Sequence, residues 1–230
     1  SVFQYWRNGT PKGFGARRYT CFNSEVYKDA SRKLVKKIAE HYGKNQNVVG
    51  WQIDNEIGHE GSDVCVCPNC IEKWAIWLKD KYKSIDNLNK LWGNVFWGTS
   101  YKTFEQIPVP VENPALKYNP SLVLDYYRFS SDSAVGFSNM QFDILRETIN
   151  ETQWITTDLF SPSMSCSIDF EKMYETFDMV GANNYPVWGN MNEPAPYFFT
   201  SSVLAYERGL KNQDHFTIFE QICGFQGHTV

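Results

Sequence analysis

Four short apolar runs alternate with helical stretches along this chain, and that alternation most limits the folds it can adopt. Polar or turn-forming residues bound each run, which predicts strands at 48–53, 154–159, 179–182 and 216–219. Capping and periodicity signals predict helices at about 24–43, 70–83, 120–150 and 200–210. Strands that alternate with helices favour a parallel sheet with right-handed crossovers, either closed as a barrel or left open.

The length of the chain limits how much of a barrel it can form. It has 230 residues, 42% of them hydrophobic, which is enough to bury the core of one domain. A closed (β/α)8 TIM barrel needs eight strands, and about four are predicted here. We therefore expect an α/β fold in which residues 1–230 form a partial catalytic barrel, roughly strands four to seven, without the first strands and the eighth. The unpaired edges of such an internal piece disfavour folding or activity in isolation.

Charge and hydropathy exclude two classes of partner. The formal net charge of -4 at pH 7 disfavours a nucleic-acid surface. The densest basic cluster lies on one face of a predicted helix and is interpreted as a solvated face; it comprises Arg32, Lys33, Lys36 and Lys37. No apolar run has the ~20 residues that span a bilayer, so no membrane partner is expected.

Two glutamates follow predicted strands at the point where each strand gives way to a loop. Glu56 comes after the run 48–53, and Glu220 ends the run 216–219. Barrel enzymes carry their catalytic residues at the carboxyl ends of strands. Most glutamates are solvated, but a carboxylate beside a buried strand needs a functional reason. A pair of such carboxylates indicates hydrolysis of a glycosidic bond.

The cysteines form a second constellation. Cys65, Cys67 and Cys70 lie within six residues, and Cys21 could supply a fourth thiolate to close a tetrahedral zinc site. Disulfides or unrelated free thiols remain the alternatives, although close spacing in one loop disfavours unstrained bridges. A site with four cysteine ligands has no open coordination position, so its zinc would be structural. Thiolate coordination favours a reducing compartment, and we expect a cytoplasmic protein.

Motifs along nearly the whole chain resemble those of the glycoside hydrolase family 42 β-galactosidases. The motifs are GARRYTC at 15–21, VVGWQIDNE at 48–56, the three-cysteine cluster, FSSD at 129–132, NNYP at 183–186 and FEQ at 219–221. The resemblance implies a (β/α)8 barrel, retaining hydrolysis of β-galactosides, and zinc held by Cys21, Cys65, Cys67 and Cys70. It also implies a full-length protein of several hundred residues that forms homo-oligomers, often trimers.

The resemblance also implies roles for residues that match the motifs. Glu56 resembles the general acid/base at the end of the fourth strand, and Glu220 the nucleophile at the end of the seventh. Asn55 resembles the asparagine that hydrogen-bonds the sugar 2-hydroxyl. Tyr185 resembles the tyrosine that contacts the nucleophile.

Two further residues are candidates for the sugar pocket. Arg17 resembles the pocket arginine, and Trp97 resembles an aromatic wall. Taken alone, Arg17 reads as a surface or ion-pair arginine, and Tyr185 and Trp97 as core residues. The chain departs from the family pattern at Ile57, where tyrosine is common, and at His228, where tryptophan is common. The second departure puts the sugar specificity in question.

Other functions stay open at this level. A sugar-binding barrel without turnover would explain the departure at His228. A related retaining β-glycosidase could act on a different sugar. A zinc-held structural or assembly module would explain the cysteines and leave the glutamates without a task.

Overall fold

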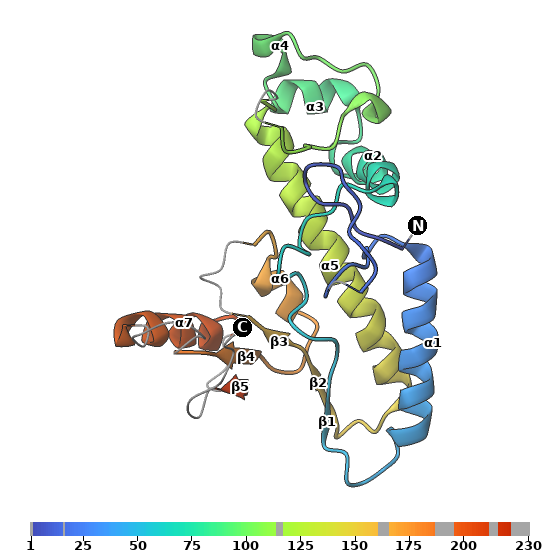
Figure 1. Ribbon diagram of the computed structural model, residues 1–230, viewed down its shortest axis with the longest axis vertical. Coiled ribbons are helices and arrows are strands. Elements are labelled where there is room, and N and C mark those ends of the chain that lie inside the picture. Colours follow the sequence, from blue (N-terminus) through green and yellow to red (C-terminus); the bar gives the residue numbers. More distant parts are fainter. Residues whose placement is uncertain are drawn as a thin grey trace. The chain divides into compact units, whose positions relative to one another are not determined.

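The computed structural model describes residues 2–15, 17–113, 117–160, 166–186, 196–211 and 216–221 (Figure 1). Its helices are α1 (Glu25–Tyr42), α2 (Pro68–Tyr82), α3 (Ile85–Leu91), α4 (Asn94–Trp97), α5 (Pro120–Thr148), α6 (Phe170–Tyr174) and α7 (Tyr197–Gly209), with a short 3-10 helix at Phe104–Gln106. Its strands are β1 (Gly50–Gln52), β2 (Trp154–Thr156), β3 (Asp158–Leu159), β4 (Gly181–Asn184) and β5 (Thr217–Gln221). No helix in these ranges is long and apolar enough to cross a membrane.

The strands that the structure describes pair in parallel. β1 pairs with β2, β3 pairs with β4, and β4 pairs with β5. Only Thr157 separates β2 from β3, so one run of chain pairs with β1 through its first half and with β4 through its second. The strands therefore follow one another in sequence order, and the predicted α/β class with parallel strands is confirmed.

The four predicted strands are present, with shifted limits. The apolar run 48–53 yields a strand only from Gly50 to Gln52. The strand predicted at 179–182 is β4, which continues past Ala182 into Asn183 and Asn184. Their partners in β5 are Glu220 and Gln221. A shift of register between Ala182 and Asn183 accompanies this change from apolar to polar residues. Polar residues thus form the carboxyl end of the sheet.

Close packing between neighbouring strands requires glycine at two positions. A Cβ at Gly50 would lie 1.9 Å from the Trp154 ring. A Cβ at Gly181 would lie 2.5 Å from the carbonyl oxygen of Thr157 and 2.6 Å from the ring of Phe219. Neither site can accept a larger residue without displacing backbone or an aromatic ring.

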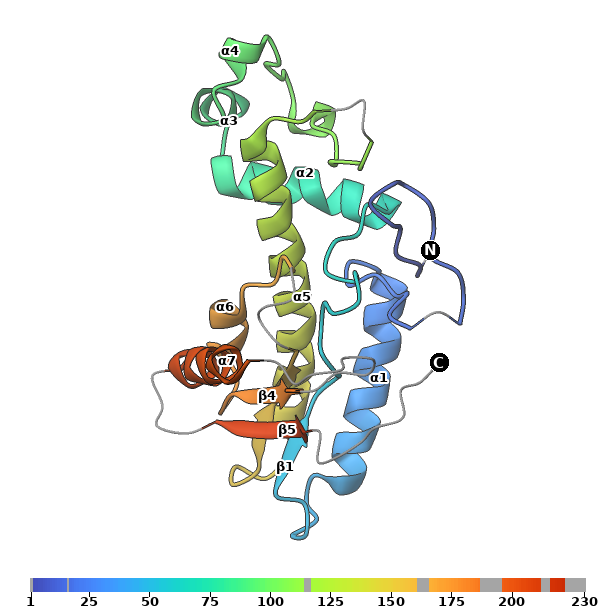
Figure 2. The ribbon, with the colours of Figure 1, turned by 60° about the vertical axis from the view of Figure 1, so that its left-hand side comes forward.

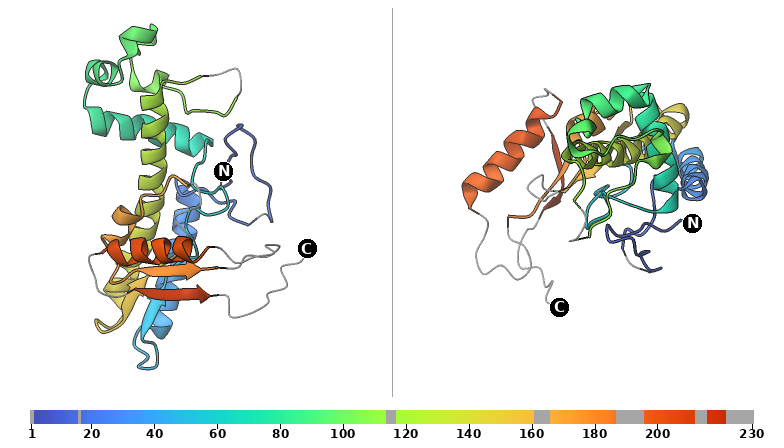
Figure 3. Two further views of the ribbon diagram at one scale, coloured as in Figure 1. Left: turned by 90° about the vertical axis from the view of Figure 1, so that its left-hand side faces the viewer. Right: turned by 90° about the horizontal axis from the view of Figure 1, so that it is seen from above.

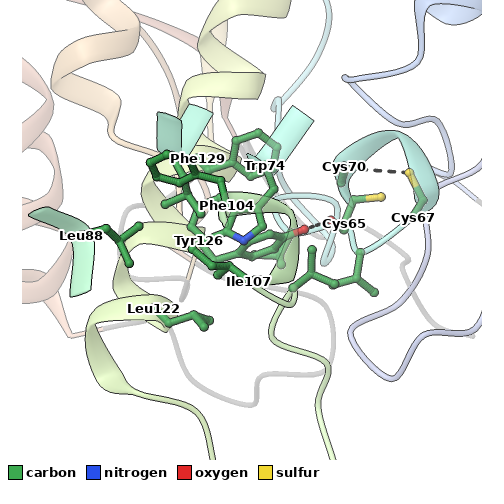
Figure 4. Packing of buried hydrophobic residues seen from close by; sticks show 14 of the residues in the cluster. Cys65, Cys67, Cys70, Trp74, Leu88, Phe104, Ile107, Leu122, Tyr126 and Phe129 are labelled. Atoms are coloured by element: carbon green, nitrogen blue, oxygen red, sulfur yellow. Dashed lines mark hydrogen bonds between the residues drawn. The ribbon is translucent and has the colours of Figure 1, made fainter. Parts of the chain in front are cut away.

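The chain divides into two compact units. The first comprises Ser1–Ser31 and Glu60–Phe137. Its core contains the fully buried Trp74, which contacts the rings of Tyr126 and Phe129 (Figure 4). The Tyr126 hydroxyl donates to the carbonyl oxygen of Cys65, 2.7 Å away, which ties this core to the cysteine loop.

The second unit comprises Arg32–His59 and Ser138–Val230 and contains all five strands of the described residues. Helix α7 lies alongside β4 and β5 (Figures 2 and 3). The buried Tyr174 of α6 donates from its hydroxyl to the carbonyl oxygens of Thr157 and Gly181, at 2.8 and 2.6 Å. This hydroxyl links the residue that follows β2 to the first residue of β4.

Candidate active site and thiol cluster

Glu56 lies in a tight turn directly after β1. Its backbone and that of Asp54 have positive φ angles, 45° and 55°, which side-chain-bearing residues rarely adopt. Two hydrogen bonds hold the turn: the Asn55 N–H donates to Asp54 Oδ1 and the Glu56 N–H donates to Asp158 Oδ1, both at 2.9 Å. The Glu56 side chain is buried. Backbone strain of this kind persists only where the surroundings enforce it and concentrates at functional sites.

Glu220 reaches the same region from β5. The Tyr185 hydroxyl donates to Glu220 Oε2. Burial, the hydrogen bond to Glu220 and the nearby negative charges raise the pKa of Tyr185 well above its usual value. The phenol therefore stays neutral and acts as a donor to the carboxylate.

Three carboxyl groups meet at this edge of the sheet. A carboxylate oxygen from each of Glu56, Asp158 and Glu220 lies within 4.8 Å of the others. Asp158 is fully buried, and burial followed by the charges of Glu56 and Glu220 raises its pKa. So many acidic groups in so small a volume disfavour simultaneous ionisation of all three.

Two asparagine amides connect the carboxyl groups. Asn183 Nδ2 donates to Glu56 Oε1 and to Asp158 Oδ2, each at 2.9 Å. In the orientation that satisfies its side chain, the Asn55 amide nitrogen donates to Asp158 Oδ2 at 3.2 Å and to Glu220 Oε1 at 3.1 Å. Each amide thus bridges Asp158 to one of the two glutamates.

Sequence reasoning did not select Asp158 as a site residue and noted Asn183 only as part of a motif. A signal was present, because Asp158 comes shortly after β2 much as Glu56 comes shortly after β1. Its position inside the predicted strand 154–159 concealed it, since an acidic residue within an apolar run reads as an irregularity. In the structure the run is divided at Thr157, and Asp158 is the first residue of β3.

The other residues singled out in the sequence belong to the first compact unit or to parts of the chain that the structure does not describe, apart from Ile57. Arg17 belongs to the first compact unit, where its exposed side chain pairs with Glu60 at 3.4 Å. Trp97 ends α4, and its side chain lies outside what the structure describes. His228 is also outside the described residues. Ile57, beside the acid, is buried.

The four predicted cysteines converge within the first unit. Sγ atoms of Cys21, Cys65, Cys67 and Cys70 all lie within 4.8 Å of one another. Cys21 is 3.5 Å from Cys70 and 3.4 Å from Cys67, and Cys67 is 3.8 Å from Cys70. These separations exceed the ~2.05 Å of a disulfide bond. All four thiols are buried and unbridged, and they could hold a metal ion.

Neighbouring groups donate to the sulfur atoms. The backbone N–H of Asn23 donates to Cys21 at 3.3 Å, its amide nitrogen donates to Cys70 at 3.4 Å, and the N–H of Tyr5 donates to Cys65 at 3.4 Å. Hydrogen bonds from Cys21, Cys65 and Cys70 lower the pKa of Cys67. Hydrogen bonds within the cluster also lower the pKa of Cys65, and they raise the pKa of Cys21 and Cys70, so the four thiols hold their protons unequally.

Comparison with known proteins gives a consistent result. A family model described as Beta-galactosidase, Glyco_hydro_42, matches residues 2–229. Beta-galactosidase Bga of Halorubrum lacusprofundi is 36% identical over 81% of this chain and 26% of that protein. Beta-galactosidase BgaA of Clostridium cellulovorans is 35% identical over 98% of this chain and 33% of that protein. The chain therefore spans about a quarter to a third of these relatives.

Solved structures agree. The crystal structure of a β-galactosidase from Bacillus circulans sp. alkalophilus superposes with a TM-score of 0.86 at 30% identity, covering 98% of this chain and 32% of that one. The β-galactosidase structure from Halorubrum lacusprofundi gives a TM-score of 0.84 at 28% identity, covering 99% and 36%.

Proposed function

Because this chain belongs to glycoside hydrolase family 42, the β-galactosidase family, we propose that its protein hydrolyses terminal β-D-galactosides with retention of configuration. The proximity of Glu56 and Glu220, with carboxylate oxygens within 4.8 Å, carries the proposal. Retaining enzymes place the two carboxyl groups ~5–5.5 Å apart, whereas inverting enzymes leave ~6.5–9.5 Å for a water molecule. The site therefore suits direct attack on the sugar.

In the first step Glu220 attacks the anomeric carbon. The bond from that carbon to the leaving oxygen breaks as Glu56 gives its proton to the departing alcohol, and a galactosyl ester of Glu220 forms. In the second step Glu56 takes a proton from water, the water oxygen attacks the same carbon, and Glu220 leaves as carboxylate. Inversion occurs twice, so the configuration is retained.

Tyr185 and Asn55 support the nucleophile in this scheme. Both donate hydrogen bonds to Glu220, from the hydroxyl to Oε2 and from the amide to Oε1. Donors to both oxygens favour the ionised form that attacks the sugar. With both N–H groups of Asn55 engaged by Asp158 and Glu220, its amide oxygen is the group proposed to accept a hydrogen bond from a sugar hydroxyl next to the anomeric carbon, the role that the family resemblance implies.

The proposed architecture is part of a (β/α)8 barrel. In such a barrel the parallel strands follow sequence order around the wall, and the catalytic residues lie at their carboxyl ends. The order β1, β2/β3, β4, β5 and the positions of Glu56 and Glu220 are compatible with four successive strands of that wall.

The proposal includes a structural zinc ion held by Cys21, Cys65, Cys67 and Cys70. A tetrahedral ion with zinc–sulfur bonds of ~2.3 Å has sulfur–sulfur edges of about 3.8 Å, close to the separations in the cluster. Four thiolate ligands leave no position for water or substrate. The ion would therefore hold the cysteine loop to the residues around Cys21.

Substitution of the two glutamates in the full-length protein tests the function. Glu220→Gln should lower turnover of an aryl β-galactoside by more than about 1,000-fold, because the nucleophile is lost. Glu147→Gln, on the exposed surface of α5, is the matched control and should leave turnover intact. Undiminished turnover by Glu220→Gln would overturn the proposal. Galactose binding by a wild-type protein that does not hydrolyse any galactoside would favour the sugar-binding alternative.

A further inference from the structure

We infer that Asp158 is a positioning residue for the acid/base Glu56, holding both its backbone and its carboxyl group in the orientation that transfers the proton. This inference rests on the proposed function. Asp158 has no role in the two-glutamate mechanism, yet it is fully buried beside both glutamates. The Asn183 amide links it to Glu56, and the Asn55 amide links it to Glu220.

The backbone contact comes first. Glu56 has a φ of 45°, a conformation that residues with a Cβ atom rarely adopt. Its N–H would be buried without a partner if it did not donate to Asp158 Oδ1. A hydrogen bond from a buried N–H to a carboxylate is stronger than one between neutral groups, and it holds the strained turn in place.

The side-chain contact sets the orientation of an amide. A carboxylate at 158 accepts hydrogen bonds, so Asn183 must turn its NH2 group toward Asp158 Oδ2. The same NH2 group then donates to Glu56 Oε1. With Oε1 engaged as an acceptor, the transferable proton is favoured on Oε2. Asp158 thereby determines which oxygen of the acid/base delivers the proton.

The groups around Asp158 fit this role. Four ionisable groups interact electrostatically with Asp158: Glu56, Glu220, Tyr174 and Tyr185. All four are acidic, so the donors that compensate the buried carboxyl are the Glu56 N–H and the Asn183 and Asn55 amides. Replacing Asp158 by asparagine places an NH2 group against these donors and forces at least one amide to turn.

The dependence on the leaving group tests the inference in the full-length protein. A general acid matters most when the leaving group is a poor one. For Asp158→Asn, kcat/KM should fall less than about 10-fold with 2,4-dinitrophenyl β-galactoside and about 100-fold or more with phenyl β-galactoside. Asp143→Asn, on the exposed surface of α5, is the matched control and should change neither value.

A double variant separates positioning from general damage. In the Glu56→Gln background the acid is already absent, so Asp158→Asn should add less than about 3-fold to the loss with the phenyl substrate. An equal loss with every leaving group, or full additivity with Glu56→Gln, would overturn the inference while leaving the proposed hydrolase intact. Absence of turnover in the wild type would instead remove the proposed function.

Labelling of the nucleophile keeps the test valid. Asp158→Asn should still form a covalent adduct with a 2-deoxy-2-fluoro-β-galactoside that carries a dinitrophenyl leaving group, because Glu220 remains and little acid assistance is needed. If the variant does not fold, Asn183→Ala removes the same link from its other side. Asn183→Ala must then reproduce the leaving-group dependence, and a uniform loss would overturn the inference.

Discussion

The hydroxyl of Tyr185 donates a hydrogen bond to Oε2 of Glu220, across 35 residues of sequence. One residue lies just after β4 and the other in β5, so the pairing of these neighbouring strands brings them together. The contact orients the carboxylate that is proposed to attack the sugar. Replacing Tyr185 by phenylalanine removes only this hydroxyl group, so the contribution of the contact can be measured directly.

Tyr185→Phe should lower kcat/KM for an aryl β-galactoside by about 10- to 100-fold, since a hydrogen bond to a charged group contributes roughly 1.5–3 kcal/mol. The rate of labelling by a 2-deoxy-2-fluoro-galactoside should fall by a similar factor, because both reactions begin with attack by Glu220. Tyr42→Phe, at the exposed end of α1, is the control. Unchanged labelling by Tyr185→Phe would contradict the assigned contact.

Gly181→Ala should destabilise the protein by about 1–3 kcal/mol or more, since the added methyl group would meet the Thr157 carbonyl and the Phe219 ring. Thermal or denaturant unfolding measures the loss. Gly136→Ala in α5 makes the same chemical change where no atom lies within 4 Å, and its higher helix propensity should raise stability by up to ~1 kcal/mol. Equal effects of the two substitutions would refute the packing argument.

Glu207 predicts a pH-dependent stability. Its carboxyl group is buried in α7, neither oxygen has a hydrogen-bond partner among the described residues, and burial raises its pKa to about 8. The folded protein therefore keeps a proton that the unfolded chain releases near pH 4.5. The free energy of unfolding should fall as pH rises from about 4.5 to about 8, because only folding then requires the proton.

Glu207→Gln should remove that part of the pH dependence and make the protein more stable than the wild type above pH 8. Denaturant unfolding at pH 5, 7 and 9 measures both slopes. Glu171→Gln, on an exposed position of α6, should leave the slope unchanged. The prediction would be contradicted if the free energy of unfolding changed with pH in the same way in the wild type and in Glu207→Gln.

Cys67→Ser should abolish stoichiometric zinc binding and lower the thermal unfolding temperature, because structural zinc sites contribute directly to folding free energy. Elemental analysis of the purified full-length protein measures the metal. Cys166→Ser is the control, since Cys166 lies outside the four-thiol cluster. Zinc content equal to that of the wild type in Cys67→Ser would exclude the proposed ligand set.

Much of the fold could be predicted from the sequence, because apolar runs and caps report local structure directly. Proline at position 120 follows Asn119, and α5 begins at that proline as expected. The end of β4 could not be predicted in this way. Asn183 and Asn184 interrupt the apolar pattern, yet they continue the strand by pairing with Glu220 and Gln221 of β5.

The candidate site likewise has features that local sequence predicts and features that depend on distant contacts. Glu56 and Glu220 could be selected because each carboxylate stands where an apolar run ends. The left-handed backbone of Glu56 could not, since it depends on Asp158, 102 residues away. Contacts over such distances arise from the pairing of strands and leave no local pattern.

Three acidic side chains bridged by neutral amides have a consequence for substrate choice. A sugar that carries its own carboxylate, such as a uronic acid, would bring another negative charge to a place already crowded with them. We expect such glycosides to be repelled, and uncharged hexosides to be the ones admitted.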